Sequence, residues 1–140
     1  MVGRELVDRY PRRNGSLGEP ILSVNSLSGR HTHLKDASFK LRRGEILGVA
    51  GLDGSGRTEL LETIFGLRER ERGKILLDKK EVSIKSTSDA KALGFALITE
   101  ERRESGIFGI LSVLENATVA SLKKYKTGPF LSNKTRLAAT

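Results

Sequence analysis

Hydrophobic and polar residues alternate along much of the first half of the chain. In residues 36–45 three apolar side chains occupy every second position, which predicts a half-exposed strand. A shorter and less regular alternation predicts another strand at 21–27. Residues 74–84 predict a β-hairpin with its turn near Asp78 and Lys79. Together these segments indicate a layer of antiparallel strands.

Two other segments have nearly continuous apolar runs. Residues 46–50 predict a strand that is buried on both faces, as in a parallel sheet, and residues 95–100 predict a second one. Between them, apolar residues at positions 60, 61, 64 and 65 form a helical stripe, and Gly66 is a natural stop. The pattern therefore predicts an α/β core with the antiparallel strand layer attached to it.

Capping signals indicate two further helices. Ser86 or Ser88 would begin a short helix that runs through Leu93 and is stopped by the next glycine. The sequence SVLE at 112–115 is a capping box that would begin a helix running to about Leu122. Beyond that residue the sequence has no strong pattern.

Composition narrows the possible functions. The chain has 140 residues, enough for one domain, and no cysteine, which excludes disulfides and thiolate metal sites. No apolar run approaches the roughly 18 residues of a membrane span, and the first residues do not form a secretory signal, so a cytoplasmic location is expected. The net charge is +8, and residues 123–136 contain no acid. This balance suits nucleic acid, phosphates or an anionic membrane face, but no motif that reads nucleic acid accompanies it.

The sequence GLDGSGRT at 51–58 carries the strongest chemical signal. It matches the phosphate-loop spacing G-x-x-x-x-G-K-[ST] except that Arg57 replaces the lysine. The glycines would bring bare N–H groups against phosphate oxygens, and Thr58 would offer a hydroxyl to Mg²⁺. Arginine is cationic but planar and bulkier than lysine, so nucleotide binding should be kept or weakened and hydrolysis impaired. The alternative is a plain glycine turn between a strand and a helix.

Four segments carry a resemblance to a known family. They are MVGREL at 1–6, GEILGVAGLDGSGRTELLETIFG at 44–66, GFALITEERRESGI at 94–107 and LSVLENATVASL at 111–122. The chain resembles the second ATP-binding domain of the ABC-type subunits that power monosaccharide import in bacteria. It is most similar to the galactose and methyl galactoside type, with the ribose and xylose types close behind.

The resemblance implies a fold and a domain arrangement. The fold would be part of a phosphate-loop NTPase core with an attached antiparallel β layer. Residues 1–18 would be an interdomain linker and 19–140 a partial nucleotide-binding domain, with a glutamine-loop-like segment at 96–104. The family's signature motif and catalytic carboxylate are not found in the sequence. The chain is therefore expected to be an N-terminal fragment of such a domain that hydrolyses ATP negligibly by itself, although the parent protein would be an ATP-hydrolysing transporter.

The resemblance also implies roles for individual residues, with ATP and Mg²⁺ as cofactors. Glu100 falls where the family has a glutamine that contacts Mg²⁺, so Thr58 and Glu100 are the expected metal ligands. His31 is a weak candidate for stacking on adenine, and no catalytic residue is expected. The expected nucleotide-binding residues are Gly51, Asp53, Gly54, Ser55, Gly56, Arg57 and Thr58.

The expected partners follow from the same resemblance. They are ATP or ADP, a transmembrane permease subunit contacted through residues 101–116, the first nucleotide-binding domain of the same protein and, indirectly, a periplasmic sugar-binding protein. The parent protein would sit peripherally on the cytoplasmic face of the membrane, and the chain itself is expected to be soluble. No nucleic acid is expected. The alternatives left open are a basic nucleic-acid-binding module and a non-hydrolysing interaction domain with a vestigial phosphate loop.

Overall fold

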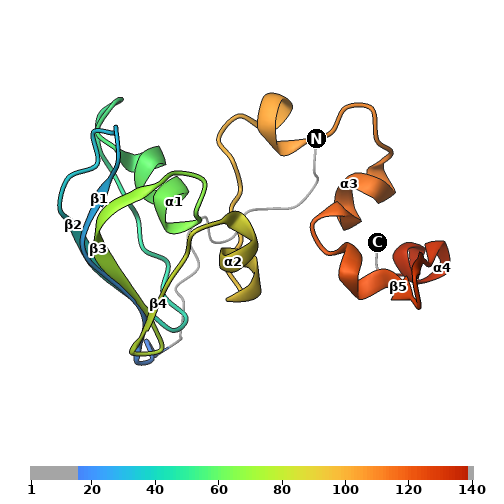
Figure 1. Ribbon diagram of the computed structural model, residues 1–140, viewed down its shortest axis with the longest axis horizontal. Coiled ribbons are helices and arrows are strands. Elements are labelled where there is room, and N and C mark those ends of the chain that lie inside the picture. The colour runs from blue at the N-terminus through green and yellow to red at the C-terminus, as the bar shows by residue number, and fades with distance from the viewer. Residues whose placement is uncertain (1–15, 139–140) are drawn as a thin grey trace, which may run out of the picture. The chain divides into compact units, whose positions relative to one another are not determined.

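A computed structural model describes residues 16–138 of the protein (Figure 1). The chain divides into two compact units, one ending at Leu97 and the other beginning at Ile98. Most of the predicted linker, residues 1–15, lies outside the described residues.

The first unit contains a four-stranded antiparallel sheet in the order β2-β1-β3-β4. Its strands are β1 (Pro20–Gly29), β2 (Ala37–Arg42), β3 (Arg70–Leu77) and β4 (Lys80–Val82). The predicted strands and hairpin are therefore confirmed. Asp78 and Lys79 connect β3 to β4 with φ of 47° and 67°, which suits a two-residue turn whose twist matches the flanking strands.

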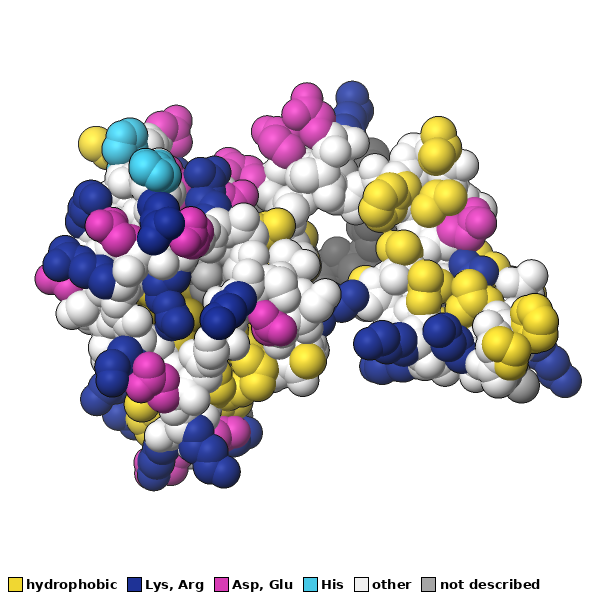
Figure 2. All heavy atoms as spheres, viewed as in Figure 1, with side chains coloured by type: hydrophobic (Ala, Val, Ile, Leu, Met, Phe, Trp, Pro, Cys, Tyr) yellow, Lys and Arg dark blue, Asp and Glu magenta, His cyan; other side chains and the backbone are white. Residues whose placement is uncertain are grey.

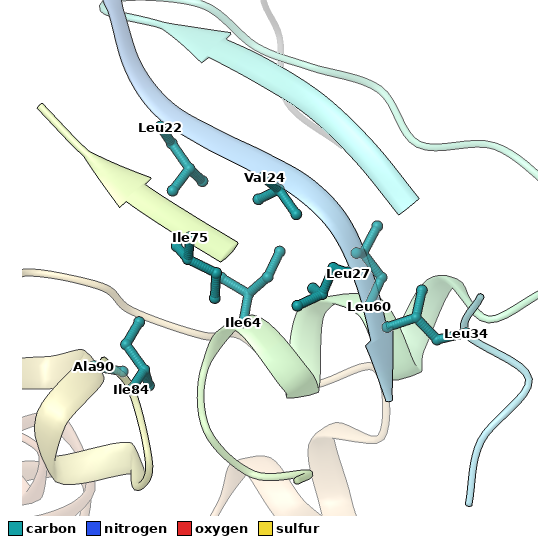
Figure 3. Close-up of a cluster of buried hydrophobic side chains, with 9 residues drawn as sticks. All are labelled: Leu22, Val24, Leu27, Leu34, Leu60, Ile64, Ile75, Ile84 and Ala90. Carbon is teal, nitrogen blue, oxygen red and sulfur yellow. The ribbon is translucent and has the colours of Figure 1, made fainter. Parts of the chain in front are cut away.

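Helix α1 (Arg57–Ile64) packs on this sheet, and apolar side chains of the helix and of the sheet form the core between them (Figure 3). Leu60 and Ile64 of the predicted stripe are buried against the sheet, whereas Leu61 is 48% exposed. Gly66 ends the helical segment with a φ of 77°. The buried core residues are Leu22, Val24, Leu27, Leu34, Leu60, Ile64, Ile75, Ile84 and Ala90.

Helix α2 (Thr87–Ala92) follows the hairpin and confirms the predicted short helix. Ser86 is its N-cap: the Ser86 hydroxyl accepts a hydrogen bond from the backbone N–H of Asp89. That bond satisfies one of the free N–H groups at the helix start. Ala90 is fully buried and, together with Ile84, joins this helix to the core (Figure 3).

The two buried strands predicted at 46–50 and 95–100 are not formed. Residues 45–50 and 95–99 belong to no strand, and the Ile46 side chain is 78% exposed. A strand buried on both faces needs hydrogen-bonded neighbours and covering side chains. Neither segment pairs with a strand among residues 16–138. Both segments instead contribute apolar side chains to a pocket of about 370 Å³ beside the sheet and α1.

The second unit is small and mostly helical (Figure 1). The predicted capping box is confirmed: the Ser112 hydroxyl accepts from the N–H of Glu115 at 3.3 Å, and the Glu115 carboxylate accepts from the N–H of Ser112 at 2.8 Å. The helix is shorter than expected and ends at Val119. The elements are η1 (Arg102–Gly106), a π-helical turn; α3 (Val113–Val119); η2 (Leu122–Tyr125), a 3₁₀ turn; β5 (Lys126–Thr127); β6 (Phe130–Leu131); and α4 (Asn133–Leu137).

Candidate nucleotide-binding site

The glycine loop leads directly into the N-terminus of α1. Gly54 and Gly56 have φ of 75° and 90°, left-handed conformations that strain any residue with a Cβ. Gly56 is also the N-cap of α1 and makes no side-chain capping bond. The partial positive charge and unpaired N–H groups of a helix start therefore lie at the end of this loop, an arrangement that suits an anion.

Contacts within the loop and with the segment after β1 accompany its turn. A Cβ on Gly51 would lie 2.5 Å from Oγ of Ser55, and the N–H of Ser55 donates to the carbonyl of Leu52 at 3.1 Å. A Cβ on Gly56 would lie 3.5 Å from Cα of Leu34. The loop thus turns tightly on itself and rests against the backbone of the segment that follows β1.

The two residues that open α1 carry the side chains that are predicted to meet phosphate and Mg²⁺. Arg57 is half-buried and forms an ion pair with Asp53, with 3.2 Å between Nη2 of Arg57 and Oδ1 of Asp53. Thr58 is exposed. A nucleotide-bound Mg²⁺ keeps most of its water and phosphate ligands and takes one or two oxygens from the protein. An exposed hydroxyl in the first helical turn fits that limited role.

The predicted adenine-stacking residue lies in the segment next to the loop. His31 has a φ of 55° and is exposed, as is His33. Both histidines lie on the face seen in Figure 2. The contact between Gly56 and the backbone of residues 33–34 brings this segment to the glycine loop.

Glu100, the second predicted metal ligand, is the third residue of the other unit and is exposed. Its role stays a prediction. Within residues 16–138 there is no group of three or more His, Asp or Glu side chains that would form a metal site of its own.

Two features of the site were missed by sequence reasoning. The ion pair between Asp53 and Arg57 uses a spacing of four residues, which often brings opposite charges together on a helix. Asp53 lies before the helix, in the loop, so the helical rule did not apply to it. The close approach of residues 33–34 to Gly56 left no signal in the sequence either.

A glycine loop that opens a helix beside a sheet is typical of phosphate-loop nucleotide-binding proteins. Residues 34–138 match the model of the ABC transporter family. The chain belongs to this family, which confirms the predicted resemblance and fold class.

Several curated proteins of this family are similar to the chain in sequence. Over 138 residues the chain is 51% identical to a galactose/methyl galactoside import ATP-binding protein of Clostridium perfringens, covering 99% of this chain and 27% of that protein. A protein of the same name from Fusobacterium nucleatum is 49% identical over 90% of this chain and 25% of its own length. A ribose import ATP-binding protein of Oceanobacillus iheyensis is 45% identical over 96% of this chain and 27% of its own length.

The chain thus spans about a quarter of the length of the curated relatives it matches. Among the helices of residues 16–138, none has the length and apolar character needed to cross a membrane.

Proposed function

We propose that this chain is part of the ATP-binding component of an ABC importer for monosaccharides, of the galactose/methyl galactoside type. The names of the relatives at 49–51% identity support the transport role. The observation that carries the nucleotide role is the glycine loop, with left-handed Gly54 and Gly56 leading into the free N-terminus of α1.

In this proposal residues 51–58 hold the nucleotide phosphates. The N–H groups of the loop and of the first turn of α1 donate to phosphate oxygens, and the helix dipole adds favourable charge. Arg57 meets a phosphate with its guanidinium, and the hydroxyl of Thr58 supplies one ligand to Mg²⁺. We assign Glu100 as a second oxygen ligand, and His31 as the side chain that borders the adenine.

Hydrolysis by the chain alone should be negligible. A lysine ammonium is a compact charge that follows the transferring phosphate, and the planar guanidinium of Arg57 is not its equivalent. We assign no catalytic residue in this chain. In the intact transporter, which hydrolyses ATP, residues 1–18 would be the linker from a first nucleotide-binding domain. Residues 19–140 would be part of the second domain, with a glutamine-loop-like segment at 96–104.

The remaining partners are proposed from the same family membership. A transmembrane permease subunit would receive the motion of the ATP-binding component, and a periplasmic sugar-binding protein would act indirectly by delivering sugar to it. This places the intact protein peripherally at the cytoplasmic face of the membrane. The choice of sugar would depend on those other subunits.

Titration calorimetry with ATP and ADP, with and without Mg²⁺, tests the nucleotide role. Arg57→Lys restores the family's usual residue and should bind ATP several-fold more tightly than the wild type. Arg43→Lys is the matched control, because Arg43 is also an arginine paired with an aspartate, in this case Asp78. It should leave nucleotide binding unchanged.

Absence of binding by both the wild type and Arg57→Lys would refute a nucleotide site at this loop. Phosphate release by the wild type above the buffer background would refute the proposal that the chain alone hydrolyses ATP negligibly. Binding of an oligonucleotide that weakens steeply with salt and ignores ATP would support the nucleic-acid alternative instead.

A further inference from the structure

The glycine loop contains its own counter-ion. Arg57 is the first residue of α1, and Asp53 lies in the turn before the helix. The guanidinium reaches back to the carboxylate, with 3.2 Å between Nη2 and Oδ1. Helical side chains lean toward the N-terminus of their helix, so this direction is natural for Arg57.

The stem of the arginine also passes beside the first glycine of the loop. Its Cδ lies 3.6 Å from the position that a Cβ on Gly51 would occupy. The Arg57 side chain therefore runs across Gly51 to reach Asp53. The positive charge that the loop offers to a ligand is already opposed by a carboxylate of the same loop.

We propose that Asp53 competes with nucleotide phosphates for Arg57 and so lowers the affinity of the loop for ATP. The inference rests on the proposed function, since it takes residues 51–58 to be the nucleotide site. It gives Asp53 a role opposite to the one expected from its place in the loop: this residue sets the affinity and does not hold the ligand.

The chemistry of the two groups explains the competition. A guanidinium can pair with a carboxylate or with a phosphate, and Asp53 already accepts from one of its nitrogens, Nη2. A phosphate that binds through Nη2 breaks the Asp53 pair and then leaves a free carboxylate beside the polyphosphate. That repulsion is strongest when the nucleotide carries its full charge, and it is weaker when Mg²⁺ neutralises part of that charge.

Asp53→Asn tests the proposal, because it keeps the size of the side chain and removes its charge. The ATP dissociation constant should fall about two- to fivefold, the range of an exposed ion pair. The improvement should be larger for ATP without Mg²⁺ than with it, and it should shrink at high salt. Calorimetry measures each value, and circular dichroism checks that the variants are folded.

Asp78→Asn is the matched control. Asp78 is also exposed and paired with an arginine, at the β3–β4 turn, and its replacement changes the net charge by the same amount. It should leave ATP affinity within twofold of the wild type. In the Arg57→Gln background, the gain from Asp53→Asn should be smaller, because the repulsion between Asp53 and phosphate remains but no guanidinium is left to be released.

The outcomes separate this inference from the proposed function. If the wild type binds ATP as tightly as Asp53→Asn does, or more tightly, the inference is overturned and the nucleotide site stands. An equal gain from Asp78→Asn, or an undiminished gain in the Arg57→Gln background, also overturns it, since general charge would explain the effect. Absence of binding by every variant overturns the proposed function and the inference with it.

Discussion

Gly73 is the position where an added methyl group should disturb the first unit most. Strand β3 passes β1 at an irregularity in the pairing, where Lys74 faces Asn25 and Arg72 faces Ser28. Two residues of β1, Ser26 and Leu27, therefore lie opposite Gly73, as in a β-bulge. Gly73 itself has a φ of 96°.

The cost of Gly73→Ala has two parts. A Cβ would lie 2.5 Å from the carbonyl oxygen of Ser26 and 2.6 Å from Cα of Leu27. Both are backbone atoms, so no side chain can turn away, and displacing them should cost about 1–3 kcal/mol. The left-handed backbone adds about 1–2 kcal/mol. The sum, about 2–5 kcal/mol, is a large part of the 5–15 kcal/mol by which a domain is typically stable.

Gly44→Ala separates these two parts. Gly44 has a similar φ of 76°, but no atom lies within 4 Å of the position of its Cβ. It should therefore lose only the backbone part, about 1–2 kcal/mol. Urea unfolding measures both free energies. Far-ultraviolet circular dichroism follows the unfolding, because the chain has no tryptophan whose fluorescence could report it. Equal destabilisation by the two variants would refute the close approach of β3 to β1.

Three other predictions concern single side chains. Thr63 and Thr118 are both 2% exposed, but only the hydroxyl of Thr118 is hydrogen-bonded. Thr63→Val should therefore be neutral or stabilising by urea unfolding, whereas Thr118→Val should cost about 1–3 kcal/mol. Leu27→Ala, at a fully buried position, should cost about 2–5 kcal/mol in the same assay, and a loss below 1 kcal/mol would contradict the core. A hydrogen bond from the Ser112 hydroxyl holds the pKa of Glu115 below its ordinary value. The ionised Glu115 carboxylate therefore stabilises α3 at neutral pH, and this stabilisation is lost as the pH falls through the lowered pKa. Hydrogen-exchange protection of α3 should drop in acid in the wild type but not in Glu115→Gln.

Local signals in the sequence predicted the local elements well. Ser86 and the pair Ser112 and Glu115 mark the starts of α2 and α3 because their side chains satisfy free N–H groups of the same few residues. The turn at 78–79 and the alternation in β2 are equally local. Such features depend on residues a few positions apart in the chain, so the local sequence is enough to predict them.

Features that depend on distant partners were not predictable. The apolar runs at 46–50 and 95–99 have the pattern of buried strands. A strand forms only where another strand pairs with it, however, and no strand among the described residues pairs with either run. The strands β5 and β6 have two residues each, too few to leave a pattern. At the candidate site, the spacing of the glycines predicted the loop, whereas the reach of Arg57 to Asp53 depends on a side-chain conformation that spacing does not determine.

The proposed function depends on the binding of nucleotide phosphates by residues 51–58. Backbone amide NMR of the whole chain, titrated with ATP and Mg²⁺, tests it most directly, because each glycine of the loop reports separately. The largest shifts should fall on Gly51 to Leu60, led by Gly54, Gly56 and Thr58. Shifts that are absent, or that avoid this loop and gather elsewhere, would contradict it.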